Sequence, residues 1–133
     1  MRVVRLLLVD DETRFVETLS KRLAARGFEV EGAFGGPQAL EMLDARPFDV
    51  VLLDVWMPGM DGLEVLKTIR QLHPTVKVVL VSGNASINAA VEGIRLGATN
   101  YLLKPVDIDE LMAKVEEAFE NKRIEEDGAD RSA

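Results

Sequence analysis

Five side chains that could together handle a phosphoryl group each directly follow an apolar stretch of the chain. They are Asp10, Asp11, Asp54, Ser82 and Lys104. Carboxylates that lie close together need a positive counter-charge to stay ionised, and Mg²⁺ is a hard cation that binds carboxylates while keeping waters and a phosphate oxygen among its ligands. Lys104 would supply a second positive charge and Ser82 a hydroxyl donor. In such a pocket, the carboxylate of Asp54 could attack a phosphoryl group as a nucleophile.

Each of these residues also has an ordinary structural explanation when it is considered alone. Asp11 could cap the helix that follows it, and Asp54 could begin a turn. Ser82 could be a loop hydroxyl, and Lys104 a solvated surface lysine. We favour the chemical interpretation because the structural one needs four coincidences, at four strand ends on one side of a sheet.

The sheet that would gather these side chains is predicted from apolar runs that alternate with amphipathic stretches, a pattern typical of parallel α/β structure. Strands are expected at residues 3–9, 28–33, 49–53, 76–81 and 100–103. The run at 49–53 is apolar on both faces, which favours a central strand, whereas 28–33 alternates and favours a place nearer an edge. We therefore predict one α/β domain, a doubly wound parallel sheet of five strands in the order 2-1-3-4-5 with five flanking helices, in three layers.

Helices are placed by the spacing of apolar residues and by glycine and proline signals. They are expected at residues 13–26, about 36–45, 62–71, 86–97 and from about 107 onward. Ser86 would cap the fourth helix, whose apolar positions are Ile87, Ala90, Val91 and Ile94. In the last helix the apolar spacing is lost after about residue 121.

The strand order decides where the candidate residues meet. In a doubly wound sheet, ligands bind at the carboxyl ends of the strands, beside the point where the strand order reverses. All five candidate side chains lie at or just after the end of a strand. The sequence therefore predicts that they converge on one edge of the sheet.

Composition and charge narrow the class of protein. The chain has 133 residues, a formal charge of −7 and no cysteine, which excludes disulfides, thiolate metal sites and a cysteine nucleophile. The negative charge argues against direct nucleic-acid binding by this domain. No apolar run approaches the roughly 18 residues needed to span a membrane, so we expect a cytoplasmic protein without membrane contact.

Four motifs carry a resemblance to a known family. The segments VDD (9–11), LLDVWMPGMDG (52–62), VSGNAS (81–86) and YLLKP (101–105) occur in this order at strand ends. Together they resemble the receiver domain of bacterial two-component response regulators, the CheY-like domains with a flavodoxin-like fold. The resemblance covers about residues 4–121, so residues 1–121 are expected to form the receiver domain and residues 122–133 a polar tail or the start of a linker.

The resemblance implies a role for each site residue. Asp54 would accept a phosphoryl group from a sensor histidine kinase or a phosphotransfer protein, giving an aspartyl phosphate. Asp10, Asp11, Asp54 and the backbone carbonyl of Trp56 would bind Mg²⁺, for which Mn²⁺ could substitute. Lys104 would contact the phosphoryl group, and the bond before Pro105 would be cis. Such a domain is no enzyme in the usual sense, since it catalyses only its own phosphorylation and dephosphorylation.

The resemblance also implies how the signal would leave the site. Ser82 and Tyr101 match the two switch positions, at which a hydroxyl and an aromatic ring move after phosphorylation. Trp56 and Asn84 would tune the lifetime of the phosphoryl group. The downstream protein partner would bind the face formed by the fourth helix, the fifth strand and the fifth helix, through which many receivers also form homodimers.

Other functions remain open at this point. The chain could act as a receiver alone, or be the receiver part of a longer regulator whose output domain binds DNA or hydrolyses ATP. A phosphatase of the haloacid-dehalogenase type also uses an Asp at a strand end, but it requires a second acid two residues later, where this chain has Trp56. A flavodoxin-like FMN binder would need a phosphate-binding loop after the first strand, where this chain has three acids.

Overall fold

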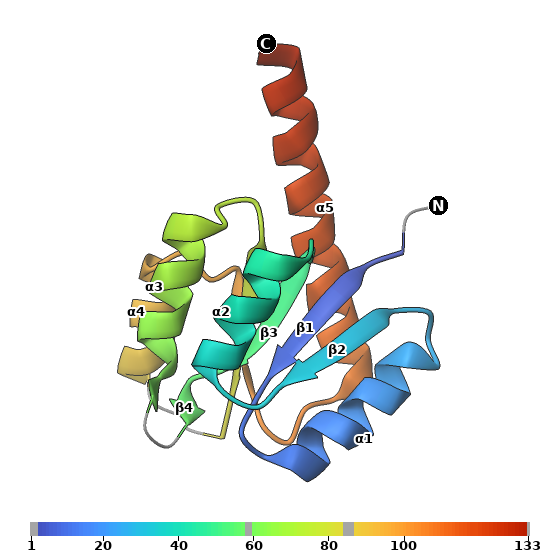
Figure 1. Cartoon of the computed structure of the whole chain (residues 1–133), viewed down its shortest axis with the longest axis vertical. Helices are drawn as coiled ribbons and strands as arrows, with labels where there is room; N and C mark the ends of the chain where they lie inside the picture. The colour runs from blue at the N-terminus through green and yellow to red at the C-terminus, as the bar shows by residue number, and fades with distance from the viewer. Residues whose placement is uncertain (1–2, 58–59, 84–86, 133) are drawn as a thin grey trace.

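The computed structural model describes residues 3–57, 60–83 and 87–132 (Figure 1). Its main sheet is parallel, with the order β2-β1-β3-β6-β7. The strands are β1 (Arg5–Val9), β2 (Glu29–Ala33), β3 (Val50–Asp54), β6 (Lys77–Ser82) and β7 (Asn100–Leu103). The helices are α1 (Thr13–Ala24), α2 (Gly36–Ala45), α3 (Gly62–Leu72), α4 (Ile87–Arg95) and α5 (Ile108–Ser132). The predicted α/β class and the order 2-1-3-4-5 are confirmed.

The core lies on both faces of this sheet because successive residues of a strand point to opposite sides. On one face, Leu7 and Val51 pack with side chains of α2 and α3. On the other face, Leu6 and Leu52 pack with side chains of α1 and α5. Every residue of β3 and β6 is buried, as expected for central strands covered on both sides.

A small antiparallel pair of strands, β4 (Trp56–Met57) and β5 (Met60–Asp61), follows β3 and was not predicted. It connects the carboxyl end of β3 to α3. Gly62 begins α3, and its backbone N–H donates to the carbonyl of Val55 at 3.0 Å. A Cβ atom on Gly62 would lie 2.5 Å from the carbonyl oxygen of Asp54. Only glycine lets α3 approach the turn after Asp54 this closely.

Helix α4 differs from the expectation in the face that it buries. The apolar residues Ile87, Val91 and Ile94 are 79%, 60% and 47% exposed. Gly93 is the buried residue of α4, and it lies against Leu80 of β6. The close approach at Gly93 fixes which side of α4 meets the sheet, and the apolar stripe is left facing solvent. The expected cap, Ser86, lies outside the described residues.

Helix α5 continues through the segment that was expected to be a polar tail or the start of a linker, and it projects beyond the amino ends of the strands (Figure 1). Two ion pairs join this extension to the sheet, one buried on both sides (Lys122–Asp49) and one between a buried lysine and an exposed glutamate (Lys77–Glu125). Lys122 Nζ lies 3.1 Å from Asp49 Oδ1, and Lys77 Nζ lies 2.6 Å from Glu125 Oε1. Among the described helices, none is long and apolar enough to cross a lipid bilayer.

Candidate functional site

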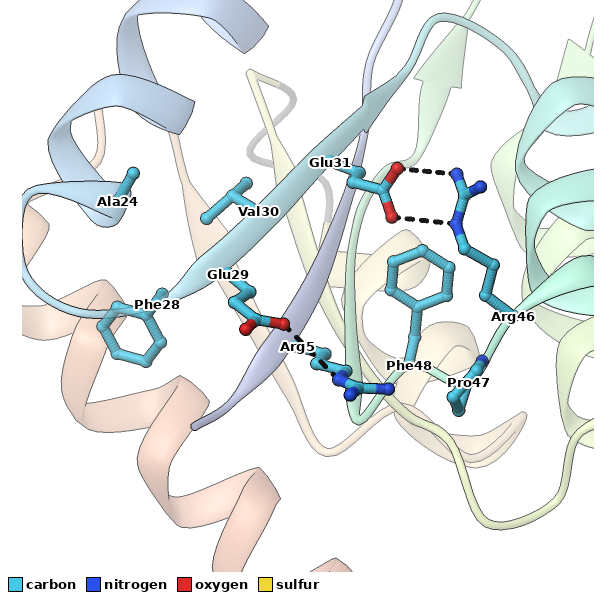
Figure 2. Close-up of a pocket in the computed structure, with 9 residues that line it drawn as sticks. All are labelled: Arg5, Ala24, Phe28, Glu29, Val30, Glu31, Arg46, Pro47 and Phe48. Atoms are coloured by element: carbon cyan, nitrogen blue, oxygen red, sulfur yellow. Dashed lines mark hydrogen bonds and ion pairs between the residues drawn. The ribbon is translucent and has the colours of Figure 1, made fainter. Parts of the chain in front are cut away.

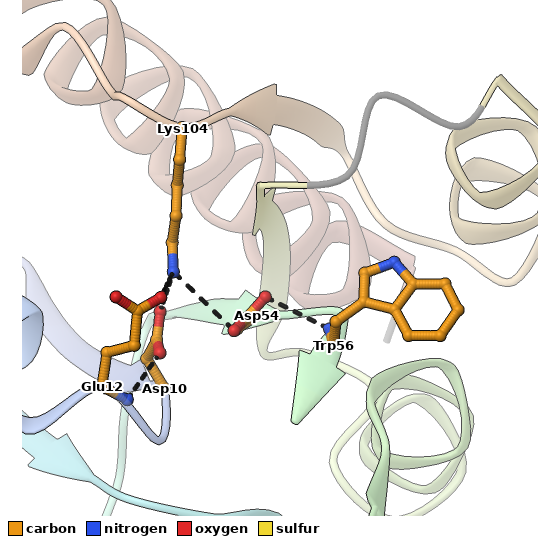
Figure 3. A network of polar contacts seen from close by, with 5 residues as sticks. All are labelled: Asp10, Glu12, Asp54, Trp56 and Lys104. Carbon is orange, nitrogen blue, oxygen red and sulfur yellow. Dashed lines mark hydrogen bonds and ion pairs between the residues drawn. The ribbon is translucent and has the colours of Figure 1, made fainter. Parts of the chain in front are cut away.

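Asp54 ends the central strand β3, and its side chain is almost completely buried, with a residue exposure of 4%. Its Oδ1 accepts a hydrogen bond from the backbone N–H of Trp56 at 3.2 Å (Figure 3). Its Oδ2 lies 3.8 Å from Lys104 Nζ, which is an ion-pair distance but too long for a hydrogen bond. Oδ1 is therefore held by the backbone, whereas Oδ2 faces the Lys104 ammonium without a hydrogen bond to it.

Asp10 follows β1 and is 1% exposed. Its backbone N–H donates to the carbonyl of Ala33, which extends the ladder with β2. Its Oδ1 accepts a hydrogen bond from the backbone N–H of Glu12 at 2.9 Å, and its Oδ2 lies 2.7 Å from Lys104 Nζ. Asp10 is thus fixed by the chain on one side and by the ammonium on the other.

Lys104 reaches the site from the end of β7. Its backbone N–H donates to the carbonyl of Ser82 at 2.8 Å, so the ends of β6 and β7 are joined. Its ammonium contacts Asp10, lies 2.8 Å from Glu12 Oε1 and sits 4.4 Å from the centre of the Phe15 ring. The Lys104–Pro105 peptide bond is cis.

Burial and neighbouring charges change the acidity of both central groups. Burial raises the pKa of Asp54 from 3.8 to about 6, and the negative charge of Asp10 adds to this effect. The N–H of Trp56 and the ammonium of Lys104 act in the opposite direction, and Asp11 contributes a weaker upward effect. For Lys104, burial alone would lower the pKa, but hydrogen bonds to Asp10 and Glu12 outweigh it and the pKa rises.

The carboxylates of Asp10, Glu12 and Asp54 form a group that could hold a metal ion. One oxygen from each lies within 4.8 Å of the others. A donor set made only of carboxylate oxygens suits a hard cation such as Mg²⁺ or Mn²⁺ and does not suit a soft one. Asp11, which was expected among the metal ligands, is exposed and is not a member of this group.

An open pocket of about 430 Å³ lies in front of these groups. It is lined by Glu12, Asp54, Trp56, Gly83 and Lys104. A larger pocket of about 490 Å³ lies beside the amino ends of β1 and β2 (Figure 2). There, Arg46 pairs with Glu31 at 2.6 Å and Arg5 with Glu29 at 3.4 Å, so its charged groups neutralise one another. Of these two pockets, only the one at the carboxyl ends of the strands is lined by residues of the predicted site, Asp54, Trp56 and Lys104.

Comparison with known proteins places the chain in a family. The family model of the response regulator receiver domain matches residues 6–116. The chain belongs to this receiver domain family. Receiver domains act as signalling domains and not as enzymes proper, and the recognition made from four motifs is confirmed.

Relatives of the receiver domain include longer regulators. This chain is 40% identical over 121 residues to the transcriptional regulatory protein ZraR of Escherichia coli O157:H7. The matched region covers 91% of this chain and 27% of ZraR. It is 41% identical over 112 residues to the DNA-binding transcriptional regulator NtrC of Escherichia coli (strain K12), which covers 84% of this chain and 24% of NtrC. The chain thus spans about a quarter of the length of these two relatives.

Solved structures show the same fold. A CheY-like response regulator receiver domain protein from Methanospirillum hungatei JF-1 superposes with a TM-score of 0.88 at 31% identity, covering 93% of this chain and 99% of that protein. NtrX from Brucella abortus, solved in complex with ADP, superposes with a TM-score of 0.91 at 34% identity, covering 97% of this chain and 30% of NtrX.

The predicted switch and tuning residues of the receiver domain occupy different surroundings. Ser82 ends β6 and is fully buried, and Tyr101 of β7 is half-buried and packs against the core. Trp56 is 59% exposed at the pocket. Asn84 lies outside the described residues.

Glu12 is the site residue that the sequence analysis missed. It sits at the N-cap position of α1, but its side chain makes no capping hydrogen bond and contacts Lys104 instead. Glu is an unusual choice for an N-cap, where Ser, Thr, Asp and Asn are preferred. That mismatch was the available signal.

Proposed function

We propose that this receiver domain accepts a phosphoryl group on Asp54 from the phosphohistidine of a sensor histidine kinase or a phosphotransfer protein. The observation that carries this proposal is the position of Asp54. Its buried carboxylate opens into a pocket and lies 3.8 Å from the Lys104 ammonium. A nucleophilic oxygen and a cation thus face the space that a phosphoryl group would occupy.

In the transfer, a carboxylate oxygen of Asp54 attacks phosphorus and forms a P–O bond while the P–N bond to the donor imidazole breaks. The imidazole leaves with the electron pair of that bond and takes up a proton. Phosphoryl transfer depends mainly on alignment and on neutralising the charge of the phosphoryl oxygens. Lys104 supplies one positive charge to those oxygens, and the Trp56 N–H holds the other carboxylate oxygen of Asp54 in place.

A divalent cation would complete this site. Asp10 and Asp54, with Glu12 or the predicted Asp11 and Trp56 carbonyl, would hold Mg²⁺ or Mn²⁺, which when bound would neutralise the carboxylates and the phosphoryl oxygens. The phosphoryl group would later be lost to water, which attacks phosphorus and regenerates the Asp54 carboxylate and inorganic phosphate. Trp56 and the predicted Asn84 would control the access of that water.

The signal would pass from the site to a protein partner. We expect the Ser82 hydroxyl to move toward the phosphoryl oxygens and Tyr101 to turn inward, because new charge-assisted hydrogen bonds bias a two-state element. Four exposed apolar side chains support α4 and β7 as the responding surface: Ile87, Val91, Ile94 and Leu103. The partner would be a downstream target or a second copy of the domain.

A second output is favoured by one observation. The chain spans about a quarter of ZraR and NtrC, and NtrC is named as a DNA-binding regulator. In a longer protein, the domain would control an attached DNA-binding or ATPase part. An open reading frame that continues past Ala133 would support this output, and a stop codon there would support a receiver that acts by itself.

The phosphoacceptor is tested by incubation with acetyl phosphate and Mg²⁺, followed by intact mass spectrometry. We expect one added phosphate in the parent protein and none in Asp54→Ala or in the presence of EDTA. The matched control is Asp109→Asn, which removes an exposed Asp in the first turn of α5. Phosphate uptake by Asp54→Ala would contradict the assignment.

A further inference from the structure

Glu12 breaks a local rule of helix capping, and this points to a role in the site. It occupies the N-cap of α1 without a side-chain capping bond. Its backbone N–H is tied to Asp10 Oδ1 at 2.9 Å, which fixes where its side chain starts. Its carboxylate then extends to Lys104 Nζ at 2.8 Å (Figure 3). The side chain thus contacts a residue 92 positions away along the chain and makes no capping bond to the first turn of its own helix.

The contacts of Lys104 are unevenly distributed around the ammonium. Three groups from the segment after β1 hold it: Asp10 at 2.7 Å, Glu12 at 2.8 Å and the Phe15 ring at 4.4 Å. From β3 it has only the ion pair with Asp54 at 3.8 Å. The ammonium is therefore held on the Asp10 side of the pocket.

The pocket shows why this matters for a phosphoryl group on Asp54. Glu12 and Lys104 line the same pocket as Asp54. A phosphoryl group placed there would bring negative oxygens close to the Glu12 carboxylate, and like charges repel. The same oxygens would compete with Glu12 for the donors of Lys104.

We infer that Glu12 is a positioning residue that holds the Lys104 ammonium on the Asp10 side of the pocket until a phosphoryl group arrives. On phosphorylation of Asp54, the phosphoryl oxygens would then replace the Glu12 carboxylate as the partner of the Lys104 ammonium. This inference rests on the proposed function of Asp54. It predicts that Glu12 opposes the phosphorylated state. A ligand gains affinity when a contact that favours the competing state is removed.

Three variants separate the contact from the charge. Glu12→Gln removes the charge. Glu12→Asp keeps the charge but is shorter by one methylene, so it loses the contact to Lys104 and gains a residue type preferred at the N-cap. Glu17→Gln is the matched control, since it removes the charge of another exposed Glu on α1. Circular dichroism and thermal unfolding verify that all three fold.

The measurement is the affinity for beryllofluoride, a phosphoryl mimic, at saturating Mg²⁺. Bound and free fluoride are counted by ¹⁹F NMR, and Trp56, the single tryptophan of the chain, gives a second signal by fluorescence. We expect Glu12→Gln to bind beryllofluoride about three- to fivefold tighter than the parent protein does, and Glu12→Asp at least about twofold tighter. These factors correspond to the free energies that ion pairs at a protein surface typically contribute. Glu17→Gln should match the parent protein.

Each other result overturns the inference. Parent-like affinity in both Glu12 variants would show that Glu12 does not restrain Lys104. A gain in Glu12→Gln alone would show that charge, and not the contact, is responsible. Weaker binding of both Mg²⁺ and beryllofluoride in both variants would make Glu12 a metal ligand instead. Absence of beryllofluoride binding in the parent protein would contradict the proposed function itself.

Discussion

Asp54 is a buried carboxylate whose neighbours pull its pKa in opposite directions. Burial and Asp10 raise the pKa to about 6, against the hydrogen bond from Trp56 and the charge of Lys104. Because this pKa lies above the value of 3.8 in a flexible chain, the folded state binds the proton more tightly than the unfolded state does. Without a divalent cation, the free energy of unfolding should therefore fall as the pH rises from about 4 to about 6.

Asp54→Asn should remove this dependence, since an amide carries no charge at any of these pH values. We expect the variant to be about 1–2 kcal/mol more stable than the parent protein at pH 7.5 in EDTA, less than the full pKa shift would imply because the pocket is open to water. The two should be nearly equal at pH 4. Urea unfolding at both pH values measures the difference. A variant that is no more stable than the parent at pH 7.5 would contradict the raised pKa.

Trp56 lines the pocket, is mostly exposed and lies two residues after Asp54. Its indole can shield an aspartyl phosphate from water, because excluding water from a reactive site protects an intermediate from hydrolysis. We expect Trp56→Ser to shorten the half-life of the phosphoryl group by about three- to tenfold, roughly 1 kcal/mol in the barrier.

The loss of phosphate after removal of acetyl phosphate, followed by intact mass, gives this half-life. Trp56→Phe retains an aromatic group and should behave nearly as the parent protein does. Equal decay rates in the serine variant and the parent would remove shielding as the role of Trp56.

At the scale of elements, α5 is held to the sheet by buried charges as well as by its apolar face. Lys122 is 7% exposed and pairs with Asp49, itself 5% exposed. Asp49 also accepts a hydrogen bond from the backbone N–H of Arg5, at the start of β1. The extension of α5 is therefore joined to the amino ends of β1 and β3.

Lys122→Met should destabilise the domain by about 2–4 kcal/mol, because it removes the ammonium that lies 3.1 Å from the buried Asp49 carboxylate. Arg123→Met is the matched control. Arg123 is exposed and pairs with Glu120 on the same helix, so its loss should cost less than about 0.5 kcal/mol. Urea unfolding of both variants gives the comparison. Equal, small effects would show that the extension of α5 does not depend on this ion pair.

The sequence predicted the strands better than it predicted the ends and faces of helices. The strands were recognised because each is a local apolar run. The end of α5 was left open between a polar tail and the start of a linker, because its polar residues find partners such as Asp49 and Lys77 that lie far away along the chain. The buried face of α4 depends on the contact between Gly93 and Leu80, which no periodicity reveals.

The candidate site shows the same division. Asp10, Asp54 and Lys104 were expected to meet because each follows a strand of a parallel sheet, and the structure brings them together. Glu12 was missed because its unusual place at the N-cap of α1 does not by itself say which residue its side chain contacts. Its contact depends on the reach of Lys104 from the end of β7.

At the scale of the whole molecule, β7 belongs to both the charged site and the exposed apolar surface, and β6 ends at the site and precedes α4 in the chain. Lys104 follows β7 and is joined to Ser82 at the end of β6. Leu103, which is 50% exposed, precedes Lys104 directly. Helix α4 follows β6 in the chain and presents Ile87, Val91 and Ile94 to solvent. A movement of Ser82 or Lys104 toward a phosphoryl group would thus act on the elements that carry this apolar surface.

Exposed apolar side chains that cluster on one helix face are typical of a surface that a partner covers. We expect the domain to self-associate through α4 and β7 when beryllofluoride and Mg²⁺ are bound, and to remain monomeric without them, where its charge of −7 opposes association. Val91→Glu places a charge inside the apolar stripe and should abolish association while leaving beryllofluoride binding intact. Ile124→Glu is the matched control, because Ile124 is 59% exposed on the α5 extension, away from α4.

Sedimentation velocity at tens of micromolar protein distinguishes the two variants. A charge buried in an apolar interface without a partner is strongly unfavourable. Association that persists in Val91→Glu, or that is lost only in Ile124→Glu, would therefore assign the contact to another face.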